Sequence, residues 1–368
     1  MTRKEFIKMC GLFGIGLQFP TVLSASNKND LTSKPFSGKV LIIGAGAGGL
    51  SAAYFLAQAG INFEVLEASS AFGGRMKINT DFSDFPIPLG AEWLEANENV
   101  LHEIVNDSAA KIKFQTTVDH PDRKFVNYSW YNFFEDYIVP SIANKISYDT
   151  IVRSIDYSAS QIVVNTQKGI KKADKVVISV PLQILKDGDI NFTPSLPKRK
   201  LNAIQQVEVW GGFKAFFEFR NNFYGDNEHV FPIRPASSGQ KIVYNAALGQ
   251  NTKKNILGLF VVGAPTQDYI ERSGDELKNF MLSEIDRIYD NQASSNYLGH
   301  ISQNWNSEPF IKGGYLSDHA DWKQVRELGN SVANKLYFAG GEYTDGEDWV
   351  SVHIAALSAK KTIEEISL

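Results

Sequence analysis

A glycine triplet at positions 44, 46 and 49, followed by an acid, has the residue types and spacing of a dinucleotide-binding site. Gly44 permits a tight turn, Gly46 lets the backbone approach a pyrophosphate, and Gly49 lets a helix pack closely on a strand. Glu67 comes 18 residues after Gly49, where a carboxylate accepts hydrogen bonds from the adenosine ribose. The same charge would repel the 2′-phosphate of NADP. The spacing therefore predicts a dinucleotide other than NADP; the alternative is a plain tight turn.

The residues around the triplet predict the elements that would position it. Residues 40–43 form an uninterrupted aliphatic run, typical of a strand buried on both faces. Residues 50–59 are rich in Ala and Leu and end at Gly60, which predicts a helix. A second strand is predicted over 62–66, and it delivers Glu67 to its carboxyl end. Further backbone contacts to the cofactor are expected from Ala47, Gly48 and Ala68.

Two later segments resemble the flavin-containing amine oxidase family. Residues 69–76 contain Gly-Gly-Arg, which is similar to a family segment whose arginine faces the FAD pyrophosphate. Residues 88–94 are similar to a second segment, whose backbone lies against the isoalloxazine ring. The resemblance implies FAD as the cofactor. The residues that it places at the cofactor are Gly74, Arg75, Gly90, Ala91, Glu92 and Trp93.

The resemblance continues through the middle and the end of the chain. Val152, in a strand predicted over 151–155, matches a valine whose backbone meets the adenine in the family. Residues 336–344 are similar to the closing motif, which brings Gly341 and Glu342 to the ribityl and phosphate region. The resemblance implies that a last helix then aims its first amides at the flavin pyrimidine edge. That helix is expected to begin near Trp349, Val350 and Ser351.

Lys214 is the candidate catalytic residue, again by resemblance. In residues 210–219 it matches the lysine that holds a water against flavin N5 in the family, where a positive charge assists oxygen reduction. The alternative is an exposed strand lysine beside Glu218. Tyr315 and Tyr343 are candidate aromatic residues of the substrate pocket. Some family members attach FAD through a cysteine near Tyr343, and no cysteine stands there in this chain, so non-covalent FAD is expected.

Other positions keep a structural reading beside the functional one. Arg75 is alternatively a solvated arginine, and Glu342 a plain loop acid. Trp93 and Trp349 are alternatively core or rim aromatics.

Together these patterns predict an α/β protein in two lobes. The expected architecture is a Rossmann-like FAD-binding domain built from discontinuous segments, plus an α+β substrate domain with a mostly antiparallel sheet. The FAD-binding domain is expected at 38–95, 147–186 and 330–368, and the substrate domain at 96–146 and 187–329. Only 56 residues lie between Leu94 and Ile151, fewer than the family usually places there.

The first residues are typical of an export signal. A basic start, a short apolar run and small residues predict a signal at 1–26 and a linker at 27–37. The start also resembles the twin-arginine motif, with Lys4 where the second arginine would stand. A periplasmic or extracellular protein without a membrane span in its mature form is expected; the alternative is an anchored or interfacial N-terminal helix.

Composition excludes several classes of protein. The chain has 368 residues, 43% of them hydrophobic and 21% charged, which is typical of an ordinary globular protein. A net charge of -4 without a long basic run argues against a nucleic-acid partner. The single cysteine, Cys10, excludes an intrachain disulfide and a thiolate metal cluster, and the six histidines lack metal-ligand spacing, so no metal is expected.

Three functions fit these features. The first is an oxidase that transfers a hydride from an amine or amino acid to flavin N5, with O2 reoxidising the flavin to give imine and hydrogen peroxide. The second keeps the fold but acts as a desaturase or dehydrogenase on a carbon–carbon bond. The third is a flavin-binding protein without turnover. The sequence leaves the substrate, the electron acceptor and the oligomeric state open.

Overall fold

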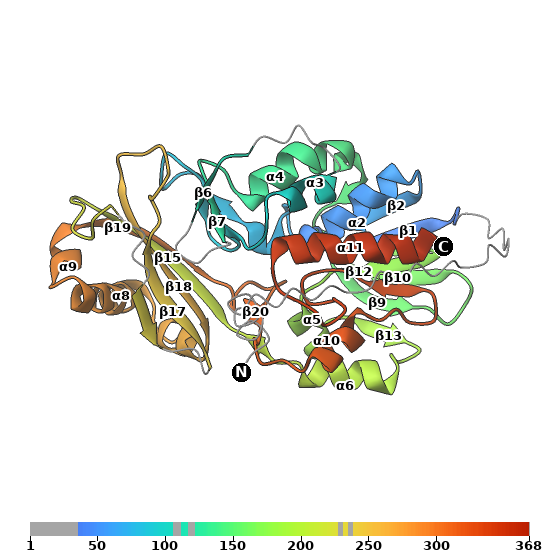
Figure 1. Cartoon of the computed structure of the whole chain (residues 1–368). Coiled ribbons are helices and arrows are strands. Elements are labelled where there is room, and N and C mark those ends of the chain that lie inside the picture. Colours follow the sequence, from blue (N-terminus) through green and yellow to red (C-terminus); the bar gives the residue numbers. More distant parts are fainter. Residues whose placement is uncertain (1–35, 106–111, 117–121, 227–230, 235–237, 368) are drawn as a thin grey trace, which may run out of the picture. The chain divides into compact units, whose positions relative to one another are not determined.

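The computed structural model describes residues 36–105, 112–116, 122–226, 231–234 and 238–367, which belong to one compact unit, Phe36–Leu368. The predicted export signal at 1–26 and most of the predicted linker at 27–37 lie outside the described residues. In Figure 1 an antiparallel sheet carries β15 to β19, and a parallel sheet contains β1, β2 and β12.

The parallel sheet positions the glycine triplet. Its four strand pairings are all parallel, as a Rossmann-like fold requires. The aliphatic run of β1 is buried on both faces, because Val40 and Ile42 pack in one hydrophobic cluster while Leu41 and Ile43 pack in another. The strands in spatial order are β21 (Leu336–Phe338), β12 (Lys175–Ile178), β1 (Lys39–Ile43), β2 (Asn62–Leu66) and β8 (Ile146–Ser147).

Two helices pack together against this sheet, α2 (Ala47–Gln58) and α11 (Val352–Ser367). Small side chains at Ala52, Ala53, Ala356 and Ala359 are fully buried and let the helices approach closely. The helix predicted over 50–59 begins three residues earlier, because Gly46 already has the extended backbone of an N-cap.

A second sheet lies on the other face of the parallel sheet. The apolar residues of β9 and β10 pack with Leu41, Ile43 and Val176. Its strands are β11 (Gly169–Ala173), β10 (Ile162–Thr166), β9 (Val152–Asp156) and β13 (Asn191–Thr193). The helices of this region are α5 (Leu182–Lys186), α6 (Lys198–Gln206) and α10 (Trp322–Gly329).

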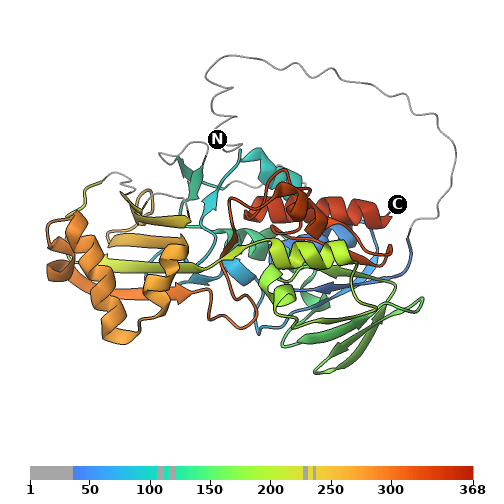
Figure 2. The same cartoon turned by 90° about the horizontal axis from the view of Figure 1, so that it is seen from below.

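The antiparallel sheet carries Lys214. In Figures 1 and 2 the orange helices α8 and α9 lie beside its strands. Phe213, Ala215 and Phe217 of β15 pack on the helix side, so the period-2 alternation turns Lys214 and Phe216 to the opposite face. The strands in spatial order are β16 (Phe231–Arg234), β17 (Gly239–Asn245), β18 (Asn255–Gly263), β15 (Gly212–Phe219) and β19 (Tyr297–Asn304).

The chain from residue 267 to 288 forms two helices rather than one. One helix ends at Ile270 and the next begins at Gly274, whose φ of 53° is left-handed. The elements after the sheet are η4 (Ala264–Thr266), α7 (Gln267–Ile270), α8 (Gly274–Ile288) and α9 (Gln292–Asn296).

The segment before β8 packs partly on the dinucleotide-binding side. Leu101 of α3 (Asn99–Val105) and Phe133 of α4 (Trp130–Tyr137) share a hydrophobic cluster with α2 and α11. The predicted domain boundaries stay a prediction.

The short elements are η1 (Gly74–Met76), β3 (Ile78–Asn79), β4 (Ile87–Pro88), β5 (Trp93–Leu94), β6 (Phe114–Thr116), β7 (Arg123–Phe125), η2 (Val139–Ser141), η3 (Ala143–Lys145), β14 (Val209–Trp210) and β20 (Tyr315–Leu316).

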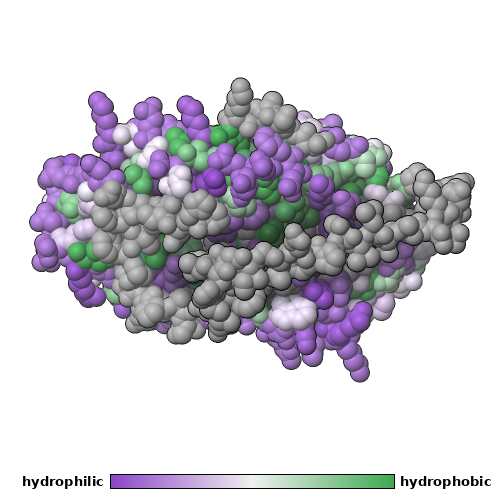
Figure 3. Space-filling view, viewed as in Figure 1, coloured by the Kyte–Doolittle hydropathy of each residue, from purple (hydrophilic) through white to green (hydrophobic). Residues whose placement is uncertain are grey.

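The described surface is mostly hydrophilic on the face shown in Figure 3, with scattered green patches. Within the described ranges, none of the helices combines the length and the apolar character needed to cross a membrane.

Candidate active site

One cavity of about 320 Å³ brings most of the predicted site residues together. Its wall is built from the β1–α2 loop, the ends of β2 and β12, the segment around Arg75, and the facing strands of the antiparallel sheet. The predicted residues on this wall are Gly44, Gly46, Ala47, Gly48, Glu67, Ala68, Gly74, Arg75, Gly90, Ala91, Val152, Lys214, Tyr315, Gly341, Glu342, Tyr343, Val350 and Ser351. The predicted residues that do not line it are Gly49, Glu92, Trp93 and Trp349.

The glycine triplet combines an open cradle with close packing. A Cβ added at Gly46 would meet no atom within 4 Å, so this position borders open space in the cavity. A Cβ at Gly49 would lie 1.9 Å from the carbonyl oxygen of Gly44, so Gly49 permits the contact of α2 with the loop. Gly44 itself has a φ of 103°, which favours glycine. Each glycine therefore has a different physical requirement.

Glu67 closes the β2 end of the cavity. Its carboxylate accepts hydrogen bonds from the backbone N–H of Ala45 at 2.5 Å and of Ser69 at 2.8 Å. Burial raises the pKa of the Glu67 carboxyl, while those backbone hydrogen bonds lower it. An oxygen acceptor at the end of the second strand suits ribose hydroxyls.

Arg75 and Glu342 form an ion pair on the cavity wall. Nη2 of Arg75 lies 2.7 Å from Oε1 of Glu342, and Nη1 donates to the carbonyl of Gly314 at 2.6 Å. Glu342 is almost fully buried, and its Oε2 accepts from the backbone N–H of Leu182 at 2.5 Å. The Arg75 side chain remains 28% exposed, so part of it stays accessible in the cavity that the glycine loop also lines. Arg75 is therefore not merely a solvated arginine, nor is Glu342 a plain loop acid.

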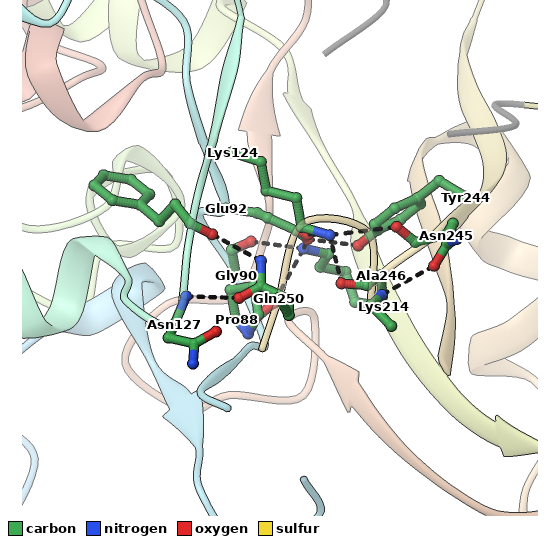
Figure 4. A network of polar contacts seen from close by, with 12 residues as sticks. Pro88, Gly90, Glu92, Lys124, Asn127, Lys214, Tyr244, Asn245, Ala246 and Gln250 are labelled. Carbon is green, nitrogen blue, oxygen red and sulfur yellow. Dashed lines mark hydrogen bonds and ion pairs between the residues drawn. The ribbon is translucent and has the colours of Figure 1, made fainter. Parts of the chain in front are cut away.

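Lys214 lies at the end of the cavity formed by the antiparallel sheet. Its Nζ donates to the carbonyls of Pro88 and Gly90, each at 3.0 Å, and to Oε2 of Glu92 at 2.6 Å (Figure 4). The side chain is only 2% exposed, which rules out an exposed strand lysine, and Glu218 pairs with Lys254 instead. Burial lowers the pKa of the Lys214 ammonium, and Glu92 raises it.

Glu92 lies behind the cavity wall. Its Oε2 also accepts from the Tyr244 hydroxyl at 2.5 Å, and its Oε1 lies 3.7 Å from Nζ of Lys124. The ring of Trp93 packs on Tyr244 and on Phe260, which does line the cavity. Glu92 and Trp93 are both predicted to contact the cofactor. In the structure Glu92 reaches the cavity through Lys214, and Trp93 reaches it through Phe260.

Aromatic residues cover the same end of the cavity. Tyr315, Phe260 and Trp305 line it there, and Tyr343 lines the cavity near the end of β12. The hydroxyl of Tyr343 donates to the carbonyl of Val180 at 2.6 Å. Burial raises the pKa values of the Tyr315 and Tyr343 hydroxyls, so both phenols stay neutral near pH 7. This region offers an apolar, aromatic surface beside a buried ammonium.

The sequence patterns missed several residues of the wall. Ser179, Val180 and Pro181 follow β12, whose carboxyl end adjoins that of β1, so the parallel sheet offered a signal for them. Thr150 and Arg153 flank the predicted Val152. Phe260 and Val262 come from β18, and Trp305, Phe310 and Lys312 come from the segment between β19 and β20.

The cavity fits FAD. Gly46 leaves an open cradle for a pyrophosphate next to the start of a helix, and Arg75 adds a positive charge there. Glu67 would hold the adenosine ribose, while the Lys214 end would hold the ring system. In the described part of the chain, no group of three or more His, Cys, Asp or Glu residues is arranged to hold a metal ion.

Comparison with known proteins agrees with this site. Residues 132–366 match the family described as "Flavin containing amine oxidoreductase", and residues 42–107 match an NAD(P)-binding Rossmann-like domain. The fold is similar to putrescine oxidase bound to putrescine, with a TM-score of 0.73 and 15% identity over 90% of this chain and 99% of that chain.

Curated relatives include Probable polyamine oxidase 4 of Arabidopsis thaliana, 22% identical over 92% of this chain and 89% of that protein. Lysine-specific histone demethylase 1 homolog 3 of the same plant is 26% identical over 54% of this chain. The chain spans 12% of the length of that demethylase homolog and 45% of Polyamine oxidase 1 of Zea mays. Because the family match covers more than half of the chain, this protein belongs to the flavin-containing amine oxidoreductases, with FAD as its cofactor.

Proposed function

We propose that this protein is an FAD-dependent amine oxidase. When bound, FAD supplies the redox chemistry: it takes a hydride from the carbon next to the amine nitrogen and passes two electrons to O2. The amine loses that hydride and one proton to become an imine, and O2 takes up two electrons and two protons to become H2O2. The observation that carries the proposal is the buried Lys214 ammonium at the aromatic end of a dinucleotide cavity.

The chain's own residues would divide the work along the cavity. The glycine-loop amides and Arg75 hold the diphosphate, and Glu67 holds the ribose. Tyr315 and Phe260 exclude water from the reacting amine, which strengthens electrostatic interactions there. Lys214 places a positive charge where negative charge develops on oxygen. No acid–base pair is required of the protein for this reaction.

The test is anaerobic mixing of the FAD-loaded protein with short diamines, longer polyamines and aromatic monoamines. We expect at least one class to bleach the flavin absorption band, and one H2O2 to form per oxidised amine after air is admitted. If no amine bleaches a flavin that dithionite still reduces, amine oxidation is wrong.

One observation favours a second candidate, a dehydrogenase that uses another electron acceptor. The three N–H donors of a lysine ammonium are matched at Lys214 by three oxygens of the chain itself. No donor is then left for oxygen or for a water beside it. This candidate predicts reduction by substrate, slow reoxidation by O2, and fast reoxidation by an artificial acceptor such as a quinone.

A further inference from the structure

Two buried clusters in this protein share one design, and only one of them touches the cavity. In the first, Glu92 accepts from Lys214 and from the hydroxyl of Tyr244. In the second, Glu284 bonds Lys241 at 2.6 Å and accepts from the hydroxyl of Tyr269. Lys241 and Glu284 do not line the cavity. The second cluster therefore serves as a reference for a buried Lys–Glu–Tyr cluster that acts on the fold alone.

We propose that Glu92 is a positioning residue, which fixes the Lys214 ammonium at the cavity wall and keeps it protonated, and that Lys124 opposes it. The proposal rests on the proposed function for the role of the Lys214 charge. It makes Glu92 a residue that acts on the flavin through Lys214 without lining the cavity.

The contacts of Lys214 define its position. Pro88 and Gly90 supply carbonyl oxygens from the segment that also lines the cavity, and Glu92 supplies a carboxylate. Three acceptors match three donors, so the ammonium is fixed in direction as well as place. Without the carboxylate, one donor of a buried cation would lose its charged partner.

Burial makes that loss important. A desolvated ammonium is disfavoured relative to the neutral amine, and an adjacent carboxylate offsets the cost. The rings of Trp93, Phe216 and Phe260 lie 5.1, 5.3 and 6.0 Å from Nζ of Lys214 and add only weak cation–π attraction. Glu92 is therefore the main group that holds the proton on Lys214.

Lys124 has the opposite effect to Glu92 on the protonation of Lys214. Nζ of Lys124 donates to the carbonyl of Ala246 at 2.5 Å and lies 3.7 Å from Oε1 of Glu92. The side chain of Lys124 is also buried, and it interacts with the same Glu92 carboxylate as Lys214 does. Removal of Lys124 would leave that charge to Lys214 alone and remove a like charge nearby.

The other charged and titratable groups around Lys214 do not replace Glu92. Arg75, on the same cavity wall, is paired with Glu342. Tyr315 of β20 and Tyr343 remain neutral because burial raises the pKa values of both hydroxyls. Across the sheet from Lys214, β18 presents Phe260 and β19 presents the uncharged Gln303.

The experiment measures how reduced flavin reacts with O2, after reduction by light or dithionite so that no amine is needed. The rate constant of wild-type protein should fall as pH rises through the pKa of Lys214. In Glu92→Gln that fall should move to lower pH. At a pH above the pKa of Lys214 in both proteins, each whole pH value by which the fall moves should slow the reaction roughly tenfold. Lys124→Met should move the fall to higher pH.

A second readout does not depend on turnover. The midpoint potential of bound FAD, measured by equilibration with a reference dye, should fall when the nearby positive charge is lost. Lys214→Met should lower it at pH values below the pKa of Lys214, and Glu92→Gln should lower it between the lowered pKa and the wild-type pKa of that lysine. Glu284→Gln is the matched control: it should lower thermal stability but leave the potential and the pH profile unchanged.

The outcomes separate the two claims. An unchanged pH profile and potential in folded Glu92→Gln overturn the positioning role. If Glu92→Gln does not fold, Lys124→Met decides, because an absent or downward movement of the pH profile there also overturns it. If the profiles move as expected but no amine reduces the flavin, the positioning role stands and amine oxidation fails.

Discussion

Arg75 connects segments that are far apart in the sequence through two separate acceptors. One guanidinium nitrogen contacts Glu342 and another donates to Gly314. A lysine has a single nitrogen on a flexible stem and does not reproduce this fork. Arg75→Lys should therefore keep the charge but weaken FAD binding about 10- to 100-fold.

The dissociation constant of FAD, obtained from the quenching of flavin fluorescence, checks this prediction. Arg123→Lys is the control, since Arg123 pairs with the exposed Glu98 and does not line the cavity. Equal affinities in wild type and Arg75→Lys would contradict the role of the fork.

At the scale of residues, local pattern predicted the residues that line the glycine-loop end of the cavity better than the partners of Lys214. Gly46 and Glu67 lie within one short strand–helix–strand unit, so their spacing alone carried the information. The partners of Lys214 depend on which strands become neighbours. Lys124 and Tyr244 come from β7 and β17, and no local rule brings them to Glu92. Tertiary pairing, rather than spacing, decides such contacts.

At the scale of elements, the contact of α2 with α11 sets the position of the glycine loop. Ala359 of α11 is fully buried in the cluster that contains α2. Ala359→Leu should overfill this contact and cost about 1–3 kcal/mol of unfolding free energy. Urea denaturation measures that loss, and Glu364→Ala, at an exposed position of the same helix, should change it little. A stability equal to wild type would show that the helices have room between them.

The elements were predictable where one segment decides its own structure. The strand β2 has the predicted bounds, and β1 matches its predicted bounds closely. The last helix was predicted from about residue 349, but it begins at Val352. Val350 has a φ of 80°, and its N–H donates to Gly341. A left-handed valine is unfavourable locally and is held there by this tertiary contact, which sequence propensity does not reveal.

At the scale of the whole molecule, one buried and one half-buried histidine make stability depend on pH. Burial lowers the pKa of His353 in α11 and of His300 in β19 below 6.5. The unfolded chain then binds more protons than the folded protein between these lowered values and about 6.5. The contribution of these two histidines to folding stability is therefore complete above pH 7. It falls as the pH drops toward 5, by at most about 1.4 kcal/mol per pH unit for each histidine.

Urea denaturation at pH 7.5 and 5.5 measures this dependence. His353→Gln should lose less stability than wild type between the two pH values, because it removes one of the protonating groups. If the two proteins lose the same amount of folding stability, His353 does not contribute to the pH dependence.

The most direct measurement of the central claim is a titration of FAD into Gly46→Ala. A methyl group at position 46 meets no protein atom within 4 Å, so the protein should fold as wild type does, with an unchanged melting temperature before FAD is added. The methyl group would occupy the pyrophosphate cradle, and the affinity for FAD should fall at least tenfold, while Gly299→Ala, away from the cavity, binds FAD normally. Undiminished FAD affinity in a folded Gly46→Ala protein would contradict the claim that this loop holds the cofactor.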